Sequence, residues 1–176
     1  MKLTKIKSFQ KVFKILLPCF YYHLSLLTFE AIMQIKYDKR GKCGIRQILL
    51  TTFLLMLSGT AFELYLLDHY EGFSQLIPLL CIFSSTVLVL VLSLQKKDRL
   101  ISFFQFILLL TACSGLYGTL LHLQANYEFE LEMKPTETNW NLFVESLSGA
   151  LPALAPCSLI VLALIGYSYS ILLKQK

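Results

Sequence analysis

Residues 47–67 read QILLTTFLLMLSGTAFELYLL, a run in which Glu63 is the only charged side chain. A helix that crosses the hydrocarbon core of a bilayer, roughly 30 Å thick, needs about 20 mostly apolar residues. This stretch meets that requirement, so we predict that it spans a membrane. It decides the class of protein, because three more stretches of the same kind follow it.

The three further runs are LIPLLCIFSSTVLVLVLSL (76–94), LISFFQFILLLTACSGLYGTLLHL (100–123) and the uncharged region 147–173, whose span we expect at 151–173. Charged residues make up 15% of the chain and apolar residues 56%, whereas soluble domains carry about 25% charged residues. The alternating segments of about ten residues that are typical of barrel strands are not visible. We predict an all-α, polytopic membrane four-helix bundle.

Positive charge is distributed unevenly along the chain. Residues 1–46 hold ten of the 16 Lys and Arg residues, the link 96–99 is KKDR, and the chain ends in KQK. The other two links, DHYEGF (68–73) and the acidic outer loop 124–150, are rich in carboxylates. Since cytoplasmic flanks carry the excess of Lys and Arg, we expect both termini in the cytoplasm. The net charge of +5 then reports orientation in a bacterial inner (plasma) membrane and does not indicate a nucleic-acid partner.

The N-terminal region 1–46 is basic and amphipathic. Apolar residues recur at helical spacing between lysines in KLTKIKSFQKVFKILL (2–17), which is typical of a helix on an anionic lipid surface. Residues 15–35 leave two arrangements open, a fifth span or a hairpin docked on lipid or on a partner. The basic flanks on both sides favour the hairpin.

Two histidines are the strongest candidates for chemistry. His69 follows the first span and His122 ends the third, so both are expected at the same outer boundary. Two imidazoles at one depth can ligate a divalent metal together with Glu71, Glu128 or Glu130, or one b-type haem. Haem-binding four-helix proteins usually hold their histidines deeper, which makes haem the weaker alternative. An ordinary interfacial role is the plain alternative to both.

Glu63 and the acidic run 126–132 are further candidates. A charged carboxylate inside a span is costly and often marks an ion or proton site; the alternative for Glu63 is a hydrogen bond to a neighbouring helix, with Gly59 allowing close approach. In the run NYEFELE, acids alternate with Phe129 and Leu131, so we expect an extended segment that packs these two residues on the bundle. Its carboxylates belong either to a cation site or to a solvated face. They are Glu128, Glu130 and Glu132, next to Asn126.

Two prolines stand four residues apart in GALPALAP (149–156). Because each lacks a backbone donor, Pro152 and Pro156 belong in a first helical turn or at a kink. Their neighbourhood either starts a helix or exposes carbonyl groups that line a cavity.

Three blocks resemble a family of uncharacterised bacterial four-helix integral membrane proteins: ELYLLDHYEGFSQLIPL (63–79), HLQANYEFELEMKP (122–135) and WNLFVESLSGALPALAP (140–156). The similarity covers about residues 50–170, and this chain departs from the family pattern at Ala125, at Cys157 and in its long basic N-terminus. The resemblance implies that the polar residues of the two outer loops are characteristic of the family together and act as one set. It brings no known activity. The matching residues are Glu63, His69, Pro78, His122, Asn126, Glu128, Phe129, Glu130, Glu132, Gly149, Ala150, Pro152 and Pro156.

Two functions are compatible with these patterns. The first is a non-catalytic accessory subunit of a larger membrane complex, favoured because the sequence shows no nucleophile–base pair, phosphate-binding loop or cysteine pair. The second is an outer-face protein that handles a metal or another ion through the two histidines and the nearby acids. A dual-topology multidrug exporter is a weaker third, because the charge bias fixes one orientation.

Overall fold

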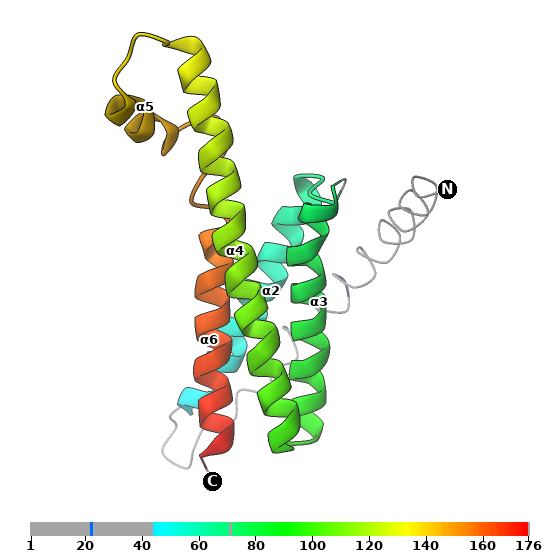
Figure 1. Cartoon of the computed structure of the whole chain (residues 1–176). Helices are drawn as coiled ribbons and strands as arrows, with labels where there is room; N and C mark the ends of the chain where they lie inside the picture. The colour runs from blue at the N-terminus through cyan, green and yellow to red at the C-terminus, as the bar shows by residue number, and fades with distance from the viewer. Residues whose placement is uncertain (1–21, 23–43, 71, 176) are drawn as a thin grey trace.

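The computed structural model describes Tyr22, residues 44–70 and residues 72–175, and from residue 44 onward it consists of α-helices joined by short links (Figure 1). The described part contains no strand. The region 1–43, expected to be amphipathic, lies outside the described residues apart from Tyr22, as does Glu71. The helices are α2 (Ile45–Leu66), α3 (Phe73–Leu94), α4 (Asp98–Met133), α5 (Asn139–Ser146) and α6 (Cys157–Lys174).

Within the described residues, four helices are long and apolar enough to cross a membrane: α2, α3, α4 and α6. This confirms the prediction of an all-α protein with four candidate spans. Large apolar side chains cover the outside of these helices, which suits contact with lipid, because soluble monomers rarely expose apolar surface this widely. They include Leu55, Phe62, Leu80, Phe83, Val87, Phe103, Phe106, Leu109, Leu110, Leu116, Val161, Leu164 and Ile171.

The four long helices form a ring in which α2 contacts α3 and α6, and α4 contacts α3 and α6 (Figure 1). The core contains Phe53 and Phe104, whose rings meet edge to face at 5.7 Å between centroids. Gly166 lies beside them, and a Cβ at this position would stand 2.6 Å from Phe53 Cε2 and 2.8 Å from Leu108 Cδ2. Small residues allow such close approach between membrane helices.

The contact between α4 and α6 is the most extensive in the bundle, and it depends on Gly115. A Cβ there would lie 2.7 Å from the carbonyl oxygen of Pro156 and 2.9 Å from Leu159 Cβ. Gly59 was expected to admit another helix, but no atom of a described residue lies within 4 Å of the place its Cβ would take. Within the described part of the chain, no helix uses Gly59 for close approach.

Helix α4 is longer than the predicted span 100–123. It has 36 residues, or about 54 Å at 1.5 Å per residue, so it extends well past a hydrocarbon core of roughly 30 Å. The expectation of an extended segment at 126–132 is therefore wrong. These residues contain strong helix formers and no glycine or proline before Pro135, and an i,i+4 hydrogen bond from Gln124 to Glu128 supports the helix.

The expected loop 124–150 is also largely helical. Helix α5 lies against the projecting part of α4 (Figure 1), and Thr138 caps it by accepting a hydrogen bond from the Asn141 backbone N–H. Helix α6 begins at Cys157, six residues later than the expected span. Its approach 151–156 is a series of tight turns, because Pro152 and Pro156 cannot donate backbone hydrogen bonds.

A candidate ligand-binding cleft at the acidic end

Opposite charges gather at opposite ends of the ring of helices. The basic end carries Arg46, Lys96, Lys97, Arg99 and Lys174, and there Lys174 donates to Gln105 and Arg46 lies over the Tyr169 ring. The other end, with the α2–α3 turn and α5, we call the acidic end. Its described carboxylates are Glu63, Asp68, Glu128, Glu130, Glu132, Glu137 and Glu145.

The end of α2 positions His69. Asp68 has a positive φ of 50°, and its N–H donates to Tyr65 O while the His69 N–H donates to Leu64 O. These two bonds form a Schellman motif, in which a left-handed residue closes the helix. Asp68 takes the place usually held by glycine, and its carboxylate accepts a hydrogen bond from the Tyr70 hydroxyl. The turn therefore holds His69 at a defined position beyond the helix.

His122 is fixed from the other side of the bundle. Its Nδ1 lies 3.2 Å from the carbonyl oxygen of Pro152. A carbonyl oxygen only accepts, so Nδ1 carries the hydrogen, and in the neutral imidazole Nε2 keeps its lone pair. The same carbonyl accepts the N–H of Ala155. The turn before α6 thus sets both the orientation and the tautomer of His122.

The fold brings His69 and His122 together, as their expected common depth suggested. Their ring centroids lie 6.3 Å apart, with the rings inclined by 66°. Burial lowers the pKa of His69, and the nearby positive charge that His122 can carry lowers it further. Both causes favour the neutral form of the His69 ring.

A cleft of about 490 Å³ opens beside this pair, between the acidic-end halves of α2, α3 and α4 and the start of α6. This volume lies within the range of about 300 to 1,000 Å³ typical of small-molecule sites. The walls are mainly apolar and include Leu67, Ile77, Tyr117 and Leu121. The remaining lining residues are Thr60, Glu63, Leu64, His69, Ser74, Gln75, Pro78, Ser114, Gly118, His122, Leu151, Pro152, Ala155, Pro156, Ser158 and Leu159.

Glu63 lines this cleft from α2 and is the only carboxylate among the described residues that line it. Its side chain is exposed, and it makes no hydrogen bond or ion pair with any residue that the structure describes. The sequence left open that Glu63 bonds to a neighbouring helix, and no such bond is seen in the described part of the chain.

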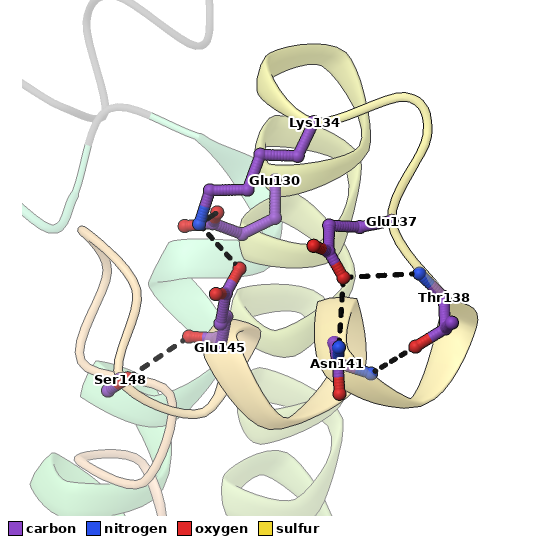
Figure 2. A network of polar contacts seen from close by, with 7 residues as sticks. All are labelled: Glu130, Lys134, Glu137, Thr138, Asn141, Glu145 and Ser148. Atoms are coloured by element: carbon purple, nitrogen blue, oxygen red, sulfur yellow. Dashed lines mark hydrogen bonds and ion pairs between the residues drawn. The ribbon is translucent and has the colours of Figure 1, made fainter.

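The three glutamates of the acidic run do not line the cleft. In the helix, Glu128 and Glu132 lie on one side and Glu130 on another, so the predicted row is absent. Lys134 Nζ lies 3.5 Å from Glu130 Oε2 and 2.7 Å from Glu145 Oε2, which ties α4 to α5 (Figure 2). The hydrogen bond that Lys134 donates to Glu145, together with the negative charge of Glu145 and Glu130, raises the pKa of Lys134.

A second polar cluster caps the start of α5 (Figure 2). Glu137 accepts hydrogen bonds from the Asn141 amide and the Thr138 N–H, and these bonds lower its pKa, with Asn141 the larger cause. Glu137 and Glu145 thus help to hold α5 in place.

Asn126 does not line the cleft, and its side chain instead bonds to the backbone of the link before α6. Its side-chain N–H groups donate to the carbonyls of Ser146 and Leu151, and its oxygen accepts the Leu151 N–H. The residue is 2% exposed. Gly149 packs against it so closely that a Cβ would stand 2.5 Å from Asn126 Cγ. Asn126 therefore fastens the link before α6 onto α4.

Of the predicted metal ligands, the described residues bring the two imidazoles together, and Glu71 lies outside the described residues. No group of three or more His, Cys, Asp or Glu side chains that could hold a metal occurs among Tyr22, residues 44–70 and residues 72–175. Protein zinc sites use three or four protein ligands, and neither Glu128 nor Glu130 reaches the histidines as a third one in the cleft lining.

Several cleft residues were missed from the sequence. Ser114 and Gly118 line the cleft but were not predicted as site residues. They precede His122 by eight and four residues, a spacing that places all three on one face of a helix. Helix α5 was missed too, although Thr138 followed by Trp140, Phe143, Val144 and Leu147 has a cap and helical spacing.

Comparison of the chain with protein-family models, with curated proteins and with solved structures gave no match. The resemblance noted for residues 50–170 stays a prediction.

Proposed function

We propose that this chain is a multi-pass protein of the bacterial inner membrane that binds a small amphipathic molecule in the cleft at its acidic end. The observation that carries the proposal is the cleft of about 490 Å³, with mainly apolar walls and a polar edge formed by His69, His122 and Glu63. Apolar walls with a few placed polar groups are typical of small-molecule sites. The proposal assigns binding and no reaction.

The orientation forms part of the proposal. Since Lys and Arg are retained on the cytoplasmic side, the basic end faces the cytoplasm with both termini, and the cleft opens on the outer side. Fusing a green fluorescent protein or alkaline phosphatase at Gln175, and separately after Pro135, tests this. Fluorescence at Gln175 and phosphatase activity at Pro135 are expected. The reverse result would place the cleft on the cytoplasmic side.

The binding test uses three probes with one apolar body: naphthylethylamine, naphthylethanol and naphthylacetate. Equilibrium dialysis of the protein in lipid nanodiscs, against empty nanodiscs, measures saturable binding. Ala155→Phe fills the cleft, since Ala155 lines it, whereas the exposed Ala150 lies outside it. Binding of at least one probe that Ala155→Phe abolishes and Ala150→Phe leaves unchanged supports the proposal. No saturable binding of any probe contradicts it.

An accessory subunit is the second candidate, and the surface of α5 favours it. Trp140 is 70% exposed, and Phe143 and Val144 are exposed beside it, on a helix that projects beyond the candidate spans. Trp and Phe are enriched in protein interfaces. Purification in mild detergent followed by mass spectrometry tests for a partner of fixed stoichiometry, which Trp140→Ser should weaken and Trp140→Phe should retain. A chain that purifies alone in both cases argues against this candidate.

A further inference from the structure

The chemistry of the cleft's polar edge narrows the class of ligand, if the cleft binds a small molecule as proposed above. Among the described residues that line the cleft, Glu63 is the only acidic side chain, and the two histidines are the only basic ones. Its carboxylate is exposed and makes no ion pair with a described residue. A ligand group with positive charge complements it, and a carboxylate or phosphate is repelled.

His122 adds a second acceptor. Its Nδ1–H is already used on the Pro152 carbonyl, so the neutral ring offers only the Nε2 lone pair. The Pro152 carbonyl also receives the Ala155 N–H, which fixes this arrangement from the backbone. The neutral His122 ring therefore cannot use Nδ1 to donate to a ligand.

The size and walls of the cleft favour an organic cation over a bare metal ion. A metal ion would need further protein ligands, and the described residues offer no group of three. The cleft has room for a ring system, and Tyr117, Ile77 and Leu121 line it with apolar surface. Aromatic rings also attract ammonium groups.

We infer that the cleft binds an amphipathic organic ammonium, with Glu63 as its counter-ion, His122 Nε2 as an acceptor for its N–H, and the apolar walls around its body. The class is a protonated amine on an aromatic or aliphatic skeleton. Glu63 and His122 come from helices α2 and α4, so the ligand's head group lies between two helices that belong to opposite sides of the ring.

The same three naphthyl probes test this inference in nanodiscs at neutral pH. The ammonium should bind at least tenfold tighter than the alcohol, and the carboxylate should bind more weakly than both. Glu63→Gln should reduce ammonium affinity at least tenfold and leave alcohol affinity unchanged. Glu132→Gln is the matched control, because Glu132 is an exposed acid of the same end outside the cleft. His122→Asn, whose amide nitrogen can replace Nδ1 on the Pro152 carbonyl, should weaken the ammonium alone.

Other outcomes overturn the inference in distinct ways. Equal affinity for the three probes, or equal effects of Glu63→Gln and Glu132→Gln, refutes the ammonium assignment, while binding blocked by Ala155→Phe still supports a ligand cleft. Zn²⁺ alone that binds stoichiometrically and displaces the ammonium would identify a metal site instead. Absence of all probe binding removes both the inference and the proposed function. Size-exclusion profiles of each variant establish that it is folded.

Discussion

His122 Nδ1 and the carbonyl oxygen of Pro152 lie 3.2 Å apart and join α4 to the turn that precedes α6. The bond connects residues 30 positions apart in the chain. It orients an imidazole toward the cleft and at the same time fixes the turn that forms part of the cleft wall. Ligand recognition and local stability are therefore coupled at this contact.

Replacing His122 separates the two roles of this contact. His122→Ala removes the donor and should lower the free energy of unfolding by about 1 kcal/mol, because the Pro152 carbonyl keeps its bond to the Ala155 N–H. His122→Asn should lose less, since its amide can donate to the same oxygen. Thermal unfolding of both variants in one detergent measures the difference. Equal loss in both variants would mean that the hydrogen bond contributes little.

Asn126 should be among the most sensitive polar residues. Asn126→Leu leaves the carbonyls of Ser146 and Leu151 and the Leu151 N–H without their side-chain partner, at a cost of about 2 to 5 kcal/mol. Hydrogen exchange should show faster exchange at residues 146–151 than in the parent protein. Gln124→Leu is the control, because its exposed side chain bonds only Glu128. Similar exchange in both variants would contradict the fastening role.

The glycines Gly166 and Gly59 form a matched pair within helices. Gly166→Ala places a methyl group against Phe53 and Leu108, and overpacking of this kind costs about 1 to 3 kcal/mol. Gly59→Ala meets no atom within 4 Å and should be neutral or stabilise α2 by up to about 1 kcal/mol. Unfolding by a denaturing detergent ranks the two variants. Destabilisation by Gly59→Ala would show that its open face is covered in the membrane.

Acid should destabilise the cleft through His69. Burial and the neighbouring His122 lower its pKa below 6.5 in the folded protein, so the unfolded chain binds the proton more readily. The contribution of neutral His69 to the free energy of unfolding is therefore fully present above about pH 6.5. It falls as the pH drops from there toward the lowered pKa. Nuclear magnetic resonance of the His69 ring measures the midpoint.

The variant His122→Asn tests the two causes of this shift separately. It should raise the pKa of His69 but leave it below 6.5, because burial is the larger cause. The midpoint in Glu63→Gln establishes how far the cleft carboxylate influences the ring. A midpoint at or above 6.5 in the parent protein would contradict the buried environment of His69.

The spanning helices were predictable from the sequence because each is encoded by a long apolar run. The four apolar runs required helices because a bilayer leaves no other partner for their backbone groups, and the structure has them. The run NYEFELE misled, because its alternation matched a strand while its residues favoured a helix. No glycine or proline occurs between Gly118 and Pro135, and α4 continues to Met133.

For the candidate site too, one part of the prediction agrees with the structure and another part does not. The expected common depth of His69 and His122 followed from span lengths, and the two rings do lie together. Glu128, Glu130 and Asn126 were expected to belong with them. Instead, Glu128 and Glu130 bond to residues of α4 and its C-cap, and Asn126 bonds to the link before α6. Sequence spacing shows which residues share a side of a helix, but not which side faces a neighbouring helix. The packing of α4 against α5 and α6 decides this.

The sequence by itself determined the helical class, the four apolar spans and the separation of basic from acidic ends, because length, hydropathy and charge act locally along the chain. Only the tertiary structure decided that Glu63, His69 and His122 share one cleft. Their meeting depends on the Schellman motif at Asp68, the close α4–α6 contact at Gly115 and the turn at Pro152. These features act between segments that are distant in the chain, so their effect follows from packing and not from residue order.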